Sequence, residues 1–508
     1  MAPPRSSAQP APAARAAPEL PTARPGAWLA LALESGGDER LWRDPHSGRD
    51  RYGVPAGVAA DEIWFSSSTA SALSPRGQAG AAEALTALTD ATMSPADLAD
   101  SLRGRLLALY APPRDGPLGA DVVLSASGTE LELLALSLAR ALSPGPLTNL
   151  VVAPTETGSG VPLAADGRYF LGSAAFDAEV PRGERLQGLE DADVTVRCIP
   201  IRAGDGAIRP LGAVDAEAFE LACDALGQGR SVLLHVLDCS KTGLSGVSRA
   251  AAARIQALDR ARVTVLVDAC QLRCDAAQVR ADLANGFAVA ITGSKFAGGP
   301  AFCGALLTPA DWSVRLAGRL ALPQGLSACS ARLDWPPLWR PAVADALTAP
   351  FNLGLALRWS AALAEIETHA TVPSATRAAI LQAFAAAVML RAARSDSIQH
   401  VGQEGAVPSI QLVRADVSPD ALAQVWRTIA ESGPDGPTCH LGQPVAVGEG
   451  AVLRLCAGMP LVNDVAAAIA GGETLEQAMS GAERDLDIVC DRLDRALTAC
   501  VSPLSARG

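Results

Sequence analysis

An acid and an amine follow two short apolar runs near the middle of the chain. The run Val263–Val267 leads directly into Asp268, and the run Phe287–Ile291 leads through a short hydroxyl-rich turn into Lys295. Continuous apolar runs of this length are typical of strands buried on both faces of a parallel sheet. Because the carboxyl ends of such strands meet at one edge of the sheet, we expect Asp268 and Lys295 to share one crevice.

This pair of side chains suits the chemistry of pyridoxal phosphate. A lysine amine can hold the cofactor as a Schiff base, while a carboxylate pairs with the protonated ring nitrogen so that the ring withdraws electrons. The hydroxyls and the glycine just before Lys295 suit the phosphate group. The alternative is a strand-end aspartate that caps a turn and a lysine on a surface loop. The two residues together with the neighbouring glycines favour a cofactor site.

The same segments resemble a known family. Asp-Ala-Cys-Gln, which begins at Asp268, and Thr-Gly-Ser-Lys, which ends at Lys295 and is followed by Gly299 and Pro300, are similar to two signatures. These are the DAxQ and SxHK...GP signatures of class V aminotransferases and cysteine desulfurases. The interval between Asp268 and Lys295 is also close to the usual spacing in that family, whose members have fold type I of the pyridoxal phosphate enzymes.

The resemblance assigns a role to each of these residues. It implies that Lys295 forms the Schiff base, that Asp268 pairs with the ring nitrogen, and that Gln271 contacts the side of the phenolic oxygen. It also implies that Thr292 and Ser294 hold the phosphate, although Ser294 stands where the desulfurases carry histidine.

A second phosphate contact is expected upstream, between a predicted strand at 121–125 and a predicted helix at 130–142. The turn between them is Ser127, Gly128 and Thr129. A glycine-containing turn at a helix N-terminus presents unpaired amides, and the helix dipole adds to their attraction for an anion. The string SGTELELLALSLA resembles the family's SGTEAxxxAxxxA segment, which implies that Gly128 and Thr129 contact the phosphate and that Ser127 belongs to the same cofactor-binding turn.

Two further segments carry predicted cofactor contacts. The family often places a histidine or another aromatic ring over the pyridine, and the matching residue here is Thr157. Either another residue covers the cofactor, or the reaction does not need an imidazole. The predicted strand 231–237 leads into Asp238 and Ser240, and the resemblance places one of these at the phenolic oxygen. His235 lies inside that strand, where a core histidine is favoured over a catalyst.

Substrate contacts are predicted at both ends of the chain. Arg454 alternates with Leu453 and Leu455, so its side chain is expected on the opposite face of a strand. The segment resembles the family's IRxSxG strand, whose arginine holds the substrate carboxylate through a planar fork. The alternative is an arginine on an exposed strand face. Ser68 and Thr69 lie where the family's N-terminal segment lines the site, although a solvated loop is equally compatible with their sequence.

The order of predicted elements is that of an α/β protein. We expect a disordered proline- and alanine-rich tail at residues 1–26. A large cofactor-binding domain at 27–350 follows, whose residues 27–75 form a lead-in segment, and then a smaller α+β domain at 351–508. The resemblance implies fold type I, with a mainly parallel seven-stranded sheet flanked by helices.

Composition limits the partners. The net charge of −12 and the absence of a dense basic cluster argue against nucleic acid or an anionic membrane, and no apolar run of about 18 residues occurs. The 11 cysteines are scattered without a matched pair of metal-ligand motifs, so we expect free thiols in the cytoplasm and no metal. A small-molecule amino substrate is the expected partner, and the family resemblance implies a homodimer.

The resemblance specifies the cofactor better than the reaction, because fold type I enzymes run several reactions on one scaffold. We expect an aminotransferase of class V type. The alternatives are a carbon–sulfur or carbon–carbon lyase, as in a cysteine desulfurase, and a catalytically silent protein of this fold. A desulfurase needs a nucleophilic cysteine before the arginine strand, and none lies between Cys329 and Cys439.

Overall fold

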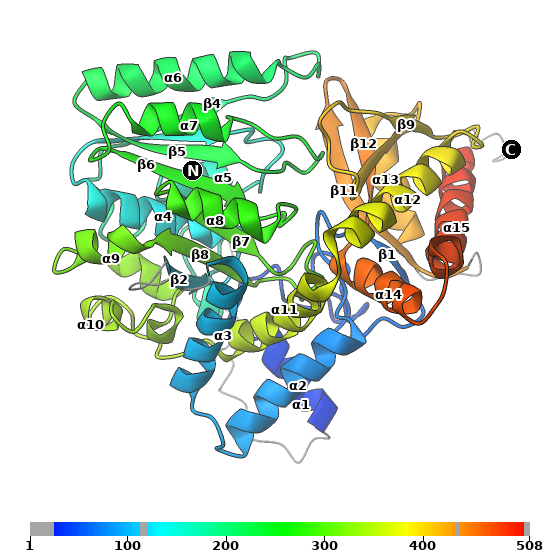
Figure 1. The fold of residues 1–508 in the computed structure, drawn as a ribbon, viewed down its shortest axis with the longest axis horizontal. Helices are drawn as coiled ribbons and strands as arrows, with labels where there is room; N and C mark the ends of the chain where they lie inside the picture. Colours follow the sequence, from blue (N-terminus) through cyan, green and yellow to red (C-terminus); the bar gives the residue numbers. More distant parts are fainter. Residues whose placement is uncertain (1–24, 112–119, 432–435, 502–508) are drawn as a thin grey trace, which may run out of the picture.

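The computed structural model describes residues 25–111, 120–431 and 436–501. Most of the tail predicted at residues 1–26 therefore lies outside the described residues. Two sheets with their covering helices make up the described chain, and they stand side by side in Figure 1.

The larger sheet has seven strands. In spatial order they are β2 (Ala120–Ser125), β8 (Gly304–Pro309), β7 (Ala288–Thr292), β6 (Val263–Ala269), β5 (Ser231–Leu237), β3 (Leu147–Val152) and β4 (Val194–Ile199). Neighbouring strands are parallel except for the two antiparallel pairs that β8 makes with β2 and β7. The mainly parallel α/β sheet expected from the sequence is confirmed.

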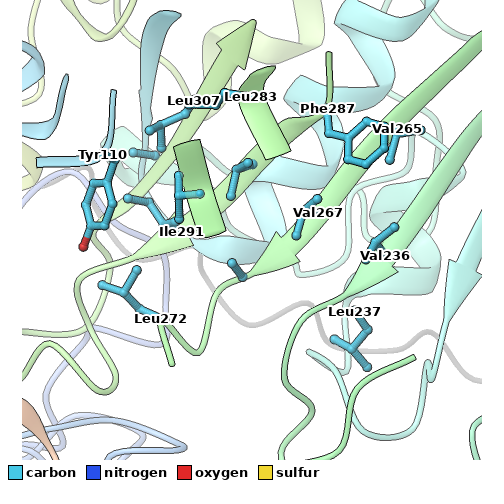
Figure 2. Close-up of a cluster of buried hydrophobic side chains, with 14 of the residues drawn as sticks. Tyr110, Val236, Leu237, Val265, Val267, Leu272, Leu283, Phe287, Ile291 and Leu307 are labelled. Atoms are coloured by element: carbon cyan, nitrogen blue, oxygen red, sulfur yellow. The ribbon is translucent and has the colours of Figure 1, made fainter. Parts of the chain in front are cut away.

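Helices cover both faces of this sheet, so alternate residues of each strand enter different cores. Val265 and Val267 of β6 join Ile291 of β7 and Leu307 of β8 in one apolar cluster (Figure 2), whereas Leu266 faces the cluster on the other side. The first face is covered by α3 (Pro95–Tyr110), α6 (Leu211–Gly227), α7 (Arg249–Gln256) and α8 (Ala276–Ala284). The second is covered by α4 (Gly128–Leu142), α5 (Val161–Ala165), α9 (Ala310–Leu316) and α10 (Arg340–Val343).

The smaller sheet combines the two ends of the chain. Its strands, in spatial order, are β1 (Ile63–Phe65), β11 (Cys439–Val447), β12 (Gly450–Cys456), β10 (Ile410–Arg414) and β9 (Gln399–Val401). It packs against α12 (Ser374–Ala392), α13 (Pro419–Ile429), α14 (Met459–Ala470) and α15 (Leu475–Val501). The lead-in segment therefore contributes a strand to a sheet otherwise built from the C-terminal part of the chain.

Three helices form a group that contacts the helices of both the larger and the smaller sheet. They are α1 (Pro25–Glu34), α2 (Pro75–Thr89) and α11 (Leu353–Thr371), and the first two pack against α11. Arg358 of α11 donates hydrogen bonds to backbone carbonyls of Leu33 and Phe302 at 2.7 Å, so one buried guanidinium joins the lead-in segment to the large sheet's loops. A boundary near residue 350 stays a prediction.

One described helix, α12, is long and apolar enough to cross a membrane by length and composition alone. In the fold, Ile380, Phe384 and Val388 of this helix are buried with residues of α15 beneath the smaller sheet. This is the packing of a core helix in a globular domain. Among the described residues, no group of three or more His, Cys, Asp or Glu side chains is arranged to hold a metal ion.

Candidate active site

A cavity of about 450 Å³ opens at the carboxyl ends of the parallel strands, and both Asp268 and Lys295 line it. Asp268 is the penultimate residue of β6 and pairs in register with Ala290 of β7. Lys295 follows three residues after the end of β7. Eleven of the residues predicted from the sequence line this cavity: Ser68, Thr69, Ser127, Gly128, Thr129, Thr157, Asp268, Gln271, Thr292, Ser294 and Lys295.

The turn that carries Lys295 is fixed by hydrogen bonds of its own backbone. The Gly293 amide donates to Cys303 at 2.8 Å, the Gly298 amide donates to the Lys295 carbonyl at 2.9 Å, and Ser71 Oγ donates to that carbonyl at 2.9 Å. The Lys295 amine itself has no hydrogen bond or ion pair with any described residue. The backbone is thus held in place while the amine is left available.

The N-terminus of α4 forms the second wall. Ser127 caps this helix by accepting a hydrogen bond from the Thr129 amide at 3.1 Å, and the Glu130 carboxylate accepts from the Ser127 hydroxyl. A side chain at Gly128 would place its Cβ 3.1 Å from Cys270 Sγ, so only glycine lets the helix start approach the end of β6 this closely. Amides and a helix dipole directed at a cavity are suited to an anion.

Solved structures have a similar fold, although comparisons with protein-family models and with curated proteins find no match. Cysteine desulfurase CsdA from Escherichia coli, in its S-sulfonic acid form, is 14% identical, with a TM-score of 0.52 over 86% of this chain and 95% of that chain. An alanine–glyoxylate aminotransferase from Nostoc sp. is 15% identical, with a TM-score of 0.52 over 86% and 96%. Oryza sativa TDC, solved with PLP and tryptamine, is 15% identical, with a TM-score of 0.53 over 87% and 84%.

This chain has the fold of the fold type I pyridoxal phosphate enzymes. Its residues also fit the cofactor. Gly128 lines the cavity at the start of α4, where a backbone amide suits a phosphate. The buried Gln271 Oε1 has no hydrogen-bond partner among the described residues. Gln271 Nε2 donates to the Ser68 carbonyl at 3.0 Å, which holds the amide on the cavity wall. Lys295 would hold the cofactor's aldehyde carbon and Asp268 its ring nitrogen.

Two buried titratable groups lie behind Asp268. Glu132 Oε2 of α4 lies 3.5 Å from His235 Nε2 of β5, and neither atom has a hydrogen bond within the described residues. Burial and the Asp268 charge raise the pKa of Glu132 well above its ordinary value, whereas burial lowers the pKa of His235 to about 4. Burial therefore favours the uncharged form of both groups. His235 is a core residue, as its position in the strand predicted.

Thr157 occupies the position at which, by the sequence resemblance, the family often has a histidine or another aromatic residue. Thr157 lines the cavity, and its hydroxyl donates to the Pro154 carbonyl at 3.5 Å. The aromatic side chains on the cavity wall instead include Phe170 and Phe302, with the guanidinium of Arg40 lying 5.2 Å and 4.6 Å from their ring centroids. The sequence analysis did not predict these residues, although Phe302 lies only two residues after Pro300 of the second signature. Arg40 and Phe170 come from segments distant from both signatures.

Asp238 and Ser240, predicted as cofactor contacts, are not brought to the cavity. Leu237, Cys239 and Lys241 line it instead. Side chains alternate along an extended segment, so the residues at even positions here point away. Asp238 forms an ion pair with Arg249 at 2.7 Å, and Ser240 donates to a carboxylate oxygen of Glu156 at 2.7 Å. The segment after β5 thus reaches the cavity, but through Leu237, Cys239 and Lys241 and not through the two predicted residues.

Arg454 does not line the cavity either. Its side chain is buried, and Nη1 donates to Ser68 Oγ at 2.9 Å while Nη2 donates to Thr69 Oγ1 at 2.8 Å. Nε and Nη2 both donate to the Gln443 carbonyl, at 3.0 and 2.7 Å. Protein acceptors therefore occupy the fork that was predicted to hold the substrate carboxylate. The contacts favour a positioning role, in which Arg454 holds Ser68 and Thr69 on the cavity wall.

We expect the Arg454→Lys variant to unfold more easily, because a lysine retains the charge but cannot supply this set of donors. The loss should be about 3 kcal/mol of the free energy of unfolding, measured by urea denaturation. The Arg414→Lys variant changes an exposed arginine on the neighbouring strand β10 and should be neutral. If Arg454→Lys is as stable as the wild type but binds an amino acid more weakly, Arg454 contacts the substrate directly and the positioning role is wrong.

The turn before Lys295 tolerates no larger residue at Gly293. A Cβ there would lie 2.5 Å from Ala362 Cβ of α11 and 2.9 Å from Cys303 Sγ. We expect Gly293→Ala to lower the free energy of unfolding by about 1–3 kcal/mol through overpacking, and to weaken cofactor uptake because the turn must move. The control is Gly104→Ala in α3, where nothing lies within 4 Å and the change should be neutral or stabilising. Equal stabilities of the two variants would disprove the close packing.

Six charged residues that line the cavity were not predicted as site residues: Glu39, Arg40, Arg51, Glu156, Arg182 and Lys241. Two of them, Glu156 and Lys241, follow strands of the larger sheet. Glu156 pairs with Arg202 and accepts hydrogen bonds from Ser240 and Thr242. Lys241 lies on the same wall. The acidic residue stands in the Thr-Glu pair before Thr157, and the lysine follows the strand end, so both were visible in the sequence as polar residues after buried strands.

Proposed function

We propose that this chain is a pyridoxal phosphate-dependent aminotransferase of class V type that acts on a small amino acid or a similar amine. The observation that carries the proposal is the meeting of Asp268, Lys295 and the N-terminus of α4 in one cavity. Pyridoxal phosphate, when bound, supplies an electron-withdrawing ring that makes the substrate's α-proton labile. Asp268, Lys295 and the N-terminus of α4 would each have a different role in the removal of this proton.

Lys295 would bind the cofactor first and then move a proton. Its amine has no partner among the described residues. The amine is therefore free to accept the proton of the substrate's α-carbon and to deliver it to the cofactor carbon that had carried the aldehyde. Asp268 would keep the ring nitrogen protonated through its negative charge. The Gly128 amide, with the Thr129 and Ser294 hydroxyls, would hold the phosphate and thereby orient the ring. The Thr129 amide caps α4 through Ser127, and the Thr292 hydroxyl donates to the Cys270 carbonyl at 2.6 Å.

The cysteines support an aminotransferase over a desulfurase. Cys239 and Cys270 line the cavity, but burial raises the pKa of Cys239 to about 12 and that of Cys270 well above its ordinary value. Cys439, which lies on β11, is also buried, and burial raises its pKa to about 11. A nucleophilic cysteine needs a lowered pKa and access. No cysteine in the cavity meets this condition.

The test is a screen of amino acids against the cofactor-loaded protein, followed by absorbance and product analysis. An aminotransferase converts the cofactor to pyridoxamine phosphate and releases one oxo acid per cofactor when no acceptor is present. A lyase would release a fragment of the substrate and leave the cofactor in its original form. Protein that takes up no cofactor would support the catalytically silent alternative.

We also propose a homodimer in the cytoplasm. All 11 cysteines are free thiols, which is compatible with a reducing compartment. The dimer rests on the family resemblance and is tested by analytical ultracentrifugation of the cofactor-loaded chain, where a monomer mass would contradict it.

A further inference from the structure

Lysine is almost absent from this chain. The sequence contains 42 lysines and arginines, and only two of these are lysines, Lys241 and Lys295. Both line the same cavity. Every basic residue elsewhere is an arginine, so the presence of a second lysine at this place points to a requirement for an amine.

The backbone of Lys241 is fixed while its amine is free. Its amide donates to the Glu156 carbonyl at 2.9 Å, and its carbonyl accepts from Arg454 Nη1 at 3.5 Å. The side chain is half-buried, and its amine has no hydrogen bond or ion pair with a described residue. A charged amine in such a place lacks the partner that buried charges normally have.

The charges around Lys241 are mostly positive. Arg454 on β12 and Lys295 after β7 are cationic neighbours, and Glu156 after β3 is the nearby anion. Glu156 is already paired with Arg202 and hydrogen-bonded to Ser240 and Thr242. This end of the cavity therefore has a surplus of positive charge that an anionic ligand would balance.

We propose that Lys241 is the cation that receives the carboxylate of the substrate. The proposal rests on the proposed function and names a specificity residue for it. Arg454, to which sequence similarity gave this role, has its donors engaged by Ser68, Thr69 and Gln443. Lys241 lies on the same cavity wall with its donors unused.

A pH dependence follows from the surroundings of the amine. Burial, followed by the charges of Arg454 and Lys295, lowers the pKa of Lys241 from 10.5 to about 8, while Glu156 opposes the change. The amine is therefore a cation below about pH 8 and loses its charge above it. Affinity for a carboxylate is present below this pH and declines as the pH rises through it.

The experiment compares the reactions of two O-substituted hydroxylamines with the cofactor-loaded protein. Aminooxyacetate carries a carboxylate, and O-ethylhydroxylamine has a methyl group in its place, so the pair isolates the carboxylate. Both react with the bound cofactor and change its absorbance. In Lys241→Gln the second-order rate constant for aminooxyacetate should fall by about 10-fold or more, while that for O-ethylhydroxylamine stays unchanged.

The control variant is Arg209→Gln, which removes one positive charge from an ion pair with Glu217 outside the cavity and should leave both rates unchanged. Lys241→Arg should recover part of the preference for the carboxylate. An equal fall for both probes in Lys241→Gln would show that Lys241 acts on the cofactor instead, and an unchanged preference would also overturn the proposal.

A second measurement does not depend on the cofactor. Reductive methylation with ¹³C-formaldehyde labels only two lysines and the N-terminus, and the Lys241 signal is identified by its absence in Lys241→Gln. Sodium acetate should shift this signal relative to sodium chloride at equal ionic strength, with a smaller effect above pH 8. If acetate acts like chloride, the proposal fails; if the shift occurs in protein that binds no cofactor, only the proposed function fails.

Discussion

Replacement of Lys295 by alanine is expected to abolish the visible absorbance of the cofactor-loaded protein and its reaction with amino acids. Lys295 has the only amine on the turn after β7, and the hydrogen bonds that hold this turn do not involve the side chain. The variant should therefore fold normally. Loss of the general base alone lowers the rate of proton transfer by about 10²- to 10⁴-fold, and the loss of covalent attachment adds to this.

The chain offers a matched control, because Lys241 is its only other lysine. Lys241→Gln should retain the visible absorbance. Borohydride reduction of the loaded wild-type protein, followed by peptide mass analysis, should place the cofactor on Lys295 alone. Cofactor trapped on Lys241, or a visible band that persists in Lys295→Ala, would refute the assignment.

The sequence predicted those parts of the site that depend on where strands end. Asp268 and Lys295 each follow a continuous apolar run, and parallel strands bring their carboxyl ends to one edge, so the two residues meet. Ser127 was similarly predictable, because a helix cap at the end of a strand has few alternative arrangements. The strands expected at 121–125, 231–237, 263–267 and 287–291 correspond to β2, β5, β6 and β7 of the larger sheet.

Two features could not be predicted in this way: which side chains of a strand end face the cavity, and which acceptors bind the donors of a buried arginine. Asp238 and Ser240 differ from Leu237 and Cys239 only by the face on which they lie, and a shift of one residue reverses the face of a whole segment. Arg454 was expected on a strand, but the partners of its fork come from other elements, Thr69 from the lead-in segment and Gln443 from β11. Which acceptors reach a guanidinium is a property of the tertiary structure.

Strand β8 and helix α1 show the same limit for the fold. β8 lies between β2 and β7 and runs antiparallel to both, although its sequence follows the glycine-rich turn after Lys295 without a distinct boundary. α1 lies in the lead-in segment, where no helix was expected, and it packs against α11, more than 300 residues away. Long-range packing stabilises an element that its own sequence pattern does not specify.

Replacement of Asp268 by asparagine is expected to slow the reaction with amino acids while leaving the cofactor bound. Asparagine keeps the shape and can still accept the hydrogen bond from the Cys270 amide, which is 3.0 Å long in the wild type. The negative charge is lost, and burial disfavours the charged form of the nearby Glu132, whose pKa it raises. The ring nitrogen would then lose its proton, and the rate of α-proton removal should fall by about 10²- to 10³-fold, as for other preorganised charges.

Asp238→Asn is the matched control, because Asp238 also follows a buried strand but points away from the cavity toward Arg249. This variant should lose some stability from the broken ion pair, yet it should react at the wild-type rate per bound cofactor. Stopped-flow absorbance with a reactive amino acid measures both variants at equal cofactor occupancy. Equal rates for Asp268→Asn and the wild type would mean that Asp268 does not control the ring nitrogen. Equal losses in both variants would mean that the effect is structural, since only one of the two carboxylates faces the place where the ring would lie.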